Sequence, residues 1–238
     1  KSPASYIVNP VNGILVVTSS VLTVTAQNQT SVYGAPLPVF TSTVTGYQYN
    51  DDSAKVLNGP TTYTFLDSNG QVVSGNNLPA GTYSIVPSLT FTTSVRYSVN
   101  AVPGTLVVTR AVLVVSAGNK TGVYGASLPA FTSSVTGYKY SDDSAKVLSG
   151  PTTYSLLNSA GQAVALNSVI PPGTYAIIPT LSLKVPSNYT VNKVNGILVI
   201  NRATLVVQAR DTGIFKGDNP PVLTSSFDSY TGLVNGDQ

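Results

Sequence analysis

The residues best suited to acid-base or metal chemistry are two pairs of adjacent aspartates, Asp51-Asp52 and Asp142-Asp143, each of which follows a Gly-Tyr-X-Tyr segment. A glycoside hydrolase needs two carboxyl groups at a defined separation, one of them with a raised pKa. Adjacent residues in a polar turn point in divergent directions. The pattern therefore does not favour hydrolysis.

The same aspartates are the candidates for a calcium site, because carboxylates and turn carbonyls are the hard oxygen donors that Ca²⁺ binds. Each pair supplies only two carboxylates, and the Asp-X-Asp-X-Asp spacing of a calcium loop is absent. The competing interpretation is a solvated turn in which an aspartate accepts hydrogen bonds from nearby backbone amides. The sequence favours this turn and leaves calcium as the alternative for Asp51, Asp52, Asp142 and Asp143.

Two tyrosine pairs are the candidates for ligand binding, namely Tyr47 with Tyr49 and Tyr138 with Tyr140. A separation of two residues predicts that both rings of a pair lie on one face of a strand, and one face of a sheet is often exposed to solvent. Such rings can stack on a sugar or contact a protein partner.

A second aromatic motif is the dipeptide Tyr-Gly, which occurs as Tyr33-Gly34 and Tyr124-Gly125. We expect its glycine to adopt a backbone conformation that other residues avoid. We expect its tyrosine to close one end of a sandwich, with the hydroxyl bonded to a nearby carbonyl. A sugar-stacking role is the alternative.

The composition excludes most catalytic chemistry. Among the 238 residues there is no Cys, Met, Trp or His, and all nine acidic residues are Asp. A thiol or imidazole nucleophile, a Cys/His zinc site and a disulfide are therefore impossible, and we expect neither an enzyme nor a cofactor.

The charge and the hydropathy pattern also limit the partners. The twelve basic residues are scattered singly and leave a net charge of only +3, so no nucleic-acid partner is expected. No apolar run approaches the roughly 18 residues of a membrane span. We therefore expect no membrane insertion in this segment, and we expect any secretion signal to lie outside it.

The sequence repeats with a period of about 91 residues. Residues 31–63 align without a gap on residues 122–154, and 26 of the 33 positions are identical. Both ends of the chain lie within a repeat, so we expect an excerpt of a longer polypeptide. The expected segments are the closing strand of a preceding repeat at 1–18, whole repeats at 19–110 and 111–202, and the N-terminal part of a further repeat at 203–238.

Within a repeat, apolar residues alternate with period two, as in Leu22-Thr23-Val24-Thr25, which is typical of half-buried strands. Turn sequences follow at intervals of roughly 8–12 residues, a spacing typical of a sandwich of about seven strands. The predicted fold class is all-β, with tandem Ig-like β-sandwich domains of about 91 residues. Connections as short as Thr109-Arg110-Ala111 lead us to expect a semi-rigid rod.

Taken together, these elements resemble the MBG ("mostly beta, glycine-rich") repeats, in the subtype marked by a Tyr-Gly-X motif. The partial copy departs at Phe215-Lys216-Gly217 and returns to the usual form at Gly232-Leu233-Val234-Asn235-Gly236-Asp237. The elements that carry the likeness, all present in both whole repeats, are Val21-Leu22-Thr23-Val24, Val32-Tyr33-Gly34-Ala35-Pro36-Leu37-Pro38, Gly81-Thr82-Tyr83-Ser84-Ile85, and Tyr97 followed by Gly104-Thr105-Leu106-Val107-Val108.

The resemblance implies a spacer or adhesin module of very large secreted or surface-anchored bacterial proteins. We therefore expect a non-enzymatic extracellular stalk segment whose partners are neighbouring repeats of the same longer chain. Two alternatives remain open. One is a carbohydrate- or protein-binding module that acts by avidity, with surface glycans among its ligands. The other is a subunit of an extracellular fibre or sheath in which copies associate side by side.

Overall fold

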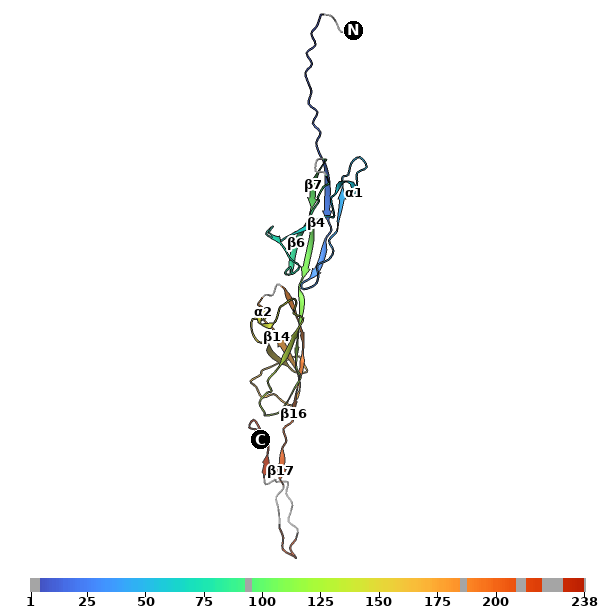
Figure 1. Ribbon diagram of the computed structural model, residues 1–238. Coiled ribbons are helices and arrows are strands. Elements are labelled where there is room, and N and C mark those ends of the chain that lie inside the picture. The colour runs from blue at the N-terminus through green and yellow to red at the C-terminus, as the bar shows by residue number, and fades with distance from the viewer. Residues whose placement is uncertain (1–4, 93–95, 185–187, 209–212, 220–228, 238) are drawn as a thin grey trace. The chain divides into compact units, whose positions relative to one another are not determined.

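The computed structural model describes residues 5–92, 96–184, 188–208, 213–219 and 229–237. The chain divides into two compact units, Lys1–Thr109 and Arg110–Gln238 (Figure 1). Each unit contains one whole repeat, and the second unit also contains the segment after residue 202, which we expect to be the beginning of a third copy.

The first unit contains two β-sheets and a single turn of helix. In chain order the elements are β1 (Ser20–Ala26), β2 (Gln29–Val32), β3 (Ser42–Thr45), α1 (Ser53–Val56), β4 (Thr62–Leu66), β5 (Val72–Val73), β6 (Gly81–Ser88), β7 (Tyr97–Val102) and β8 (Gly104–Thr109). One sheet has the strand order β3-β1-β7, and the other has the order β2-β8-β6-β4-β5.

The second unit repeats this architecture. Its elements are β9 (Ala111–Ala117), β10 (Lys120–Val123), β11 (Ser133–Thr136), α2 (Ser144–Val147), β12 (Thr153–Leu157), β13 (Ala163–Val164), β14 (Gly173–Thr180), β15 (Tyr189–Val194), β16 (Gly196–Asn201), β17 (Val206–Gln208) and β18 (Ser229–Thr231). The sheet orders are β11-β9-β15 and β10-β16-β14-β12-β13, and β17 pairs with β18. The prediction of tandem all-β sandwich domains is confirmed.

The period-two pattern of the sequence places every second side chain in the core. In β1 the inward side chains are Leu22, Val24 and Ala26, and all three are buried. Ile85 of β6 and Leu106 of β8 are also fully buried. Burying one such side chain contributes about 1.5–3 kcal/mol, so the two facing sheets hold each repeat together through these alternating positions.

The first two strands of each repeat pair with its last two strands, and the paired strands run in the same direction. In the first repeat β1 pairs with β7, and β2 pairs with β8, both in parallel. In the second repeat β9 pairs with β15, and β10 pairs with β16, again in parallel. The chain therefore enters a repeat through its first strand and leaves through its last, and each of these strands is hydrogen-bonded to a parallel strand from the other end of the repeat.

Residues 6–17 have the sequence of a closing strand, like 97–108, but no strand lies within the described residues 5–19. Leu15 is 87% exposed, whereas its equivalent in β8, Leu106, is 0% exposed. The same residue types are thus buried only where the rest of a sandwich covers them. The boundaries expected for segments 1–18 and 203–238 stay predictions.

Candidate functional site: the aspartate loop of each repeat

A glycine turns the chain out of β3 into the loop of residues 46–51, which we call the aspartate loop. Gly46 has a φ of +101°, a conformation that side chains other than hydrogen disfavour. A Cβ atom at this position would collide with the carbonyl oxygen of Val21 on β1. Gly137 begins the equivalent loop, residues 137–142, with a φ of +100° against Val112.

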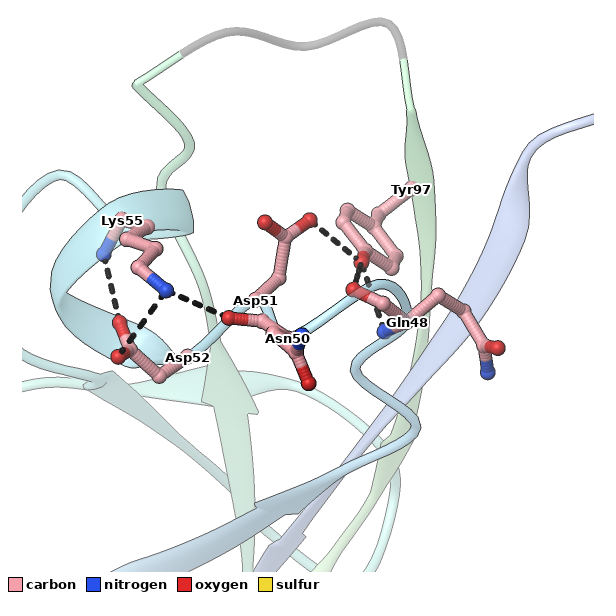
Figure 2. Close-up of polar contacts among 6 residues, drawn as sticks. All are labelled: Gln48, Asn50, Asp51, Asp52, Lys55 and Tyr97. Carbon is pink, nitrogen blue, oxygen red and sulfur yellow. Dashed lines mark hydrogen bonds and ion pairs between the residues drawn. The ribbon is translucent and has the colours of Figure 1, made fainter.

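Asp51 is held by a tyrosine from a strand far along the sequence (Figure 2). The Tyr97 hydroxyl, at the start of β7, donates to Asp51 Oδ2 at 2.8 Å and accepts the backbone N–H of Gln48 at 2.9 Å. In the second repeat the Tyr189 hydroxyl contacts Asp142 Oδ2 at 2.6 Å and accepts from the Lys139 amide at 2.9 Å. The tyrosine therefore ties the aspartate loop to the last strand of its sheet.

The surroundings of Tyr97 disfavour ionisation. Burial raises the pKa of the hydroxyl, the amide of Gln48 lowers it, and the hydrogen bond to the negative Asp51 raises it again. The net effect is a pKa above the ordinary value of 10.0. The hydroxyl keeps its proton and remains a donor to Asp51 throughout the neutral range.

Asp52 has a different partner and caps the one-turn helix α1. Its Oδ1 atom accepts the backbone N–H of Lys55 at 3.0 Å, as an N-cap residue does. The Lys55 ammonium donates to the carbonyl of Asn50 at 2.5 Å and lies 3.9 Å from Asp52 Oδ2 (Figure 2). This ion pair is exposed to solvent and adds little stability.

The same cap recurs in the second repeat, where Asp143 accepts the backbone N–H of Lys146 at 2.8 Å and caps α2. The turn interpretation of the sequence is therefore confirmed for the capping aspartates. In the first repeat one carboxylate is engaged by Tyr97 and the other by the helix amide, so the two groups of a pair serve different partners. No group of three or more acidic side chains is close enough to hold a metal ion within the described part of the chain. Calcium binding at these aspartates stays an untested alternative.

Tyr47 and Tyr49 do not share the face of a strand, and this expectation is wrong. Strand β3 ends at Thr45, Gly46 turns the chain, and Tyr49 itself has a φ of +55°. Tyr49 is 96% exposed, whereas Tyr47 packs edge-on against Tyr97 with 6.5 Å between ring centroids. The alternation of residue types continues beyond Thr45, but the extended backbone does not. Residues two apart therefore no longer lie on the same face.

The hydroxyl oxygens of Tyr47 and of Tyr138, its equivalent, are buried and accept or donate no hydrogen bond within the described residues. Burial raises the pKa of Tyr47, and the negative charge of Asp52 raises it further. Tyr138 shows the same direction, from burial and from Asp143. Tyr140 has a φ of +53° and is 45% exposed, so this pair is split in the same way.

Tyr47 contributes to a surface pocket that sequence reasoning missed. The pocket, of about 520 Å³, lies among β3, α1 and the segment that follows α1, and a pocket of about 740 Å³ occupies the equivalent place in the second repeat. Ser42 and Thr61 line it, and Ser42 donates to Thr61 at 3.2 Å and accepts the Tyr63 hydroxyl at 3.1 Å. In the second repeat Ser133 donates to Thr152 at 3.1 Å and accepts the Tyr154 hydroxyl at 2.9 Å. Both repeats therefore present a pocket with hydroxyl groups in its wall.

The nine residues that line the pocket of the first repeat all have identical equivalents in the second, where Ser149 and Lys184 join the lining. In the first repeat they are Ser42, Val44, Tyr47, Ser53, Ala54, Leu57, Gly59, Pro60 and Thr61, and in the second they are Ser133, Val135, Tyr138, Ser144, Ala145, Leu148, Ser149, Gly150, Pro151, Thr152 and Lys184. The recurrence of Ser42, Ser53 and Thr61 at an offset of 91 residues was the available signal.

The Tyr-Gly dipeptides form tight corners at the end of β2 and of β10. Gly34 and Gly125 both have a φ of +84°, so the expected backbone conformation is confirmed. The N–H of Tyr33 donates to the carbonyl of Thr109 at 2.8 Å, and the N–H of Tyr124 donates to that of Asn201 at 2.9 Å. Each corner is thus hydrogen-bonded to the last residue of the last strand of its own repeat.

No helix within the described residues is long and apolar enough to cross a membrane. The comparison with curated proteins found no match. A family model described as "MBG domain (YGX type)" matches residues 22–107 and again residues 113–199. The chain therefore belongs to the MBG domain family of the YGX type, of which it carries two copies in tandem.

Proposed function

We propose that these repeats are a load-bearing, non-enzymatic spacer segment of a bacterial surface protein and work outside the cell. Membership of the MBG family is compatible with the repeat region of such a protein. A composition without Cys, His or Glu offers little to catalysis and suits a structural role. The observation that carries the proposal is the parallel pairing of the first two strands of each repeat with its last two.

Tension along a chain of repeats enters each domain at its first strand and leaves at its last. In the first repeat six residue pairs join β1 to β7, and four pairs join β2 to β8. Because the paired strands are parallel, pulling on opposite ends of the domain slides them past each other. All hydrogen bonds of the ladder then carry load together and have to break together.

An antiparallel hairpin loaded at its open end would behave differently, because its hydrogen bonds would break one after another. The strands that take the load here are also anchored in the core. Leu22 and Val24 of β1 and Leu106 of β8 are fully buried, so sliding a strand would also expose apolar surface. Resistance to force is a matter of the unfolding rate, and both features raise the barrier to unfolding.

Single-molecule pulling of the whole chain through its two ends tests the proposal. We expect two separate unfolding events, one for each repeat. Each event should release about 300 Å of chain, since roughly 90 residues extend by 3.3–3.6 Å each. A gradual extension without distinct events would contradict a load-bearing role.

A second candidate function is ligand binding in the repeated pocket, and the observation that favours it is the polar wall found in both repeats. Hydroxyl groups in such a wall can bind the hydroxyls of a saccharide, and two copies on one chain would bind by avidity. A screen of glycans against the chain tests it. Ala54→Arg and Ala145→Arg should fill the pockets and abolish binding, whereas Asn69→Arg in a distant turn should leave it unchanged.

A further inference from the structure

The Tyr-Gly corner of the second repeat contacts the beginning of the third copy. The Tyr124 hydroxyl donates to Asp237 Oδ1 at 3.3 Å. A Cβ atom added to Gly125 would lie 2.5 Å from both Cβ and Cγ2 of Val234. The side chain of Val234 therefore rests directly on the backbone of the corner, where only glycine leaves room.

The partner of this corner is a third aspartate loop, residues 232–237. Gly232 has a φ of +106°, and a Cβ there would collide with the carbonyl of Thr204, as Gly46 does with Val21 in the first repeat. The loop follows the β17–β18 pair, in which Val206 faces Thr231. The same register joins β1 to β3 and β9 to β11. The contact thus involves an element that each copy carries, including the partial one.

The corner and the third copy also enclose a small pocket of about 280 Å³, with more apolar than polar surface. Tyr124 and Pro172 of the second repeat and Leu205 and Val234 of the third copy are among its walls. The hydroxyl contact, the close approach at Gly125 and this pocket are adjacent. Together they form one contact surface, to which residues before and after the connection Arg202-Ala203 contribute.

We infer that the Tyr-Gly corner of the second repeat is the docking site that holds the aspartate loop of the third copy. Gly125 is then required for two reasons: it adopts a positive φ, and it leaves room for Val234 of the third copy. The structure also corrects the expectation that the Tyr124 hydroxyl bonds to a carbonyl, since its partner is a carboxylate.

The aspartate of the loop can serve both of its partners at once. Inside a repeat, Asp51 and Asp142 receive their own tyrosine at Oδ2. At the junction Asp237 receives the preceding corner at Oδ1. One carboxylate has acceptor sites for both hydrogen bonds. The docking contact therefore joins the Tyr-Gly corner of the second repeat to the aspartate of the third loop.

Nuclear magnetic resonance on the full chain tests the inference through two readouts. The first is the set of Overhauser cross-peaks between the methyl protons of Val234 and the α protons of Gly125, which we expect to observe. The second is hydrogen exchange of the Asp237 amide, which donates to the Val234 carbonyl at 3.0 Å within the loop. Exchange reports local opening of the loop.

Gly125→Ala should abolish the proximity of Val234 to residue 125 and raise exchange of the Asp237 amide about tenfold or more. Gly161→Ala is the matched control, because Gly161 has a φ of +76° with nothing within 4 Å of an added Cβ. It carries the same backbone strain without a partner and should leave the Asp237 amide unchanged.

Tyr124→Phe gives a second test should the glycine variant fail to fold, since it removes only the hydroxyl. We expect the exchange rate of the Asp237 amide to rise about threefold in this variant. In Asp237→Asn we expect the same rise for the neighbouring amides of the loop. In the double variant the effects should not add. Absence of the cross-peaks in the unaltered chain, additive effects, or an unchanged loop in Gly125→Ala would each overturn the inference. The load-bearing proposal would survive that failure, because it rests on pairing inside a repeat.

Discussion

Replacing Tyr97 by phenylalanine should loosen the aspartate loop of the first repeat alone. The ring and its edge-on packing against Tyr47 remain, whereas the hydroxyl disappears. Gln48 loses the acceptor of its N–H at 2.9 Å, and Asp51 loses a donor at 2.8 Å. The change therefore isolates two hydrogen bonds from the packing around them.

The magnitude follows from the partners of the hydroxyl. A neutral hydrogen bond contributes about 0.5–1.5 kcal/mol net, and one to a charged group about 1.5–3 kcal/mol. Asp51 is only half-buried and regains water when the tyrosine hydroxyl is lost. We therefore expect a loss near the lower end of the sum, about 2 kcal/mol, which corresponds to a roughly 30-fold change in an equilibrium constant.

Hydrogen exchange on the full chain measures this loss directly. In Tyr97→Phe the Gln48 amide should exchange about 30 times faster, while the Lys139 amide of the second repeat should keep its rate. Tyr189→Phe should give the mirror result, because Tyr189 accepts from Lys139. If Gln48 exchanges at the same rate in Tyr97→Phe, or if both amides accelerate together, the hydroxyl does not hold the loop as described.

Three further outcomes test the energetics of the repeat. Because burial raises the pKa of Tyr97 above 10.0, its contribution to stability is complete below pH 10 and is lost as pH rises through the folded value. The melting temperature of the chain should therefore fall as the pH rises above about 10, and less so in Tyr97→Phe. Gly59→Ala should cost about 1–2 kcal/mol, because its φ of +98° is strained for alanine but the space around it is open. Gly46→Ala should cost about 2 kcal/mol more, since its Cβ meets backbone; equal costs in urea unfolding would refute that collision. Added calcium should leave the melting temperature unchanged, and a rise that disappears in the double variant Asp51→Asn with Asp52→Asn would instead establish a metal site.

Local sequence patterns were sufficient to predict the strands and the caps of the short helices. The alternation Leu22-Thr23-Val24-Thr25 predicts a half-buried strand, and β1 buries those apolar positions. The cap at Asp52 is also local, since its partner is the amide three residues later. In both cases the interacting groups lie within a few residues of each other, so the pattern of residue types determines the result.

Sequence reasoning failed where the partners are distant in sequence or where the backbone leaves a regular conformation. The Tyr97 hydroxyl meets Asp51 across 46 residues, and no periodicity indicates that pairing. The prediction for Tyr47 and Tyr49 extended strand geometry past a glycine of positive φ. Gly46 itself was the signal, because a glycine after an alternating run often ends a strand.

The parallel pairing of the first two strands of a repeat with its last two could not be predicted from local patterns either. A period of two shows that a segment is a strand, but it does not show which strand lies beside it or in which direction. The pairing of β2 with β8 joins residues 77 positions apart, such as Gln29 and Leu106. This long-range fact is the one on which the load-bearing proposal rests.

The direction dependence of unfolding under force tests that proposal most directly. Because the chain has no cysteine, introduced cysteines give unique attachment points. Thr18→Cys with Thr109→Cys loads the first repeat through opposite ends of its parallel ladders. Gln27→Cys with Pro103→Cys loads both ladders from the same end, where hydrogen bonds break one at a time. We predict a clearly higher unfolding force for the first pair, and an equal or lower force would contradict the load-bearing role.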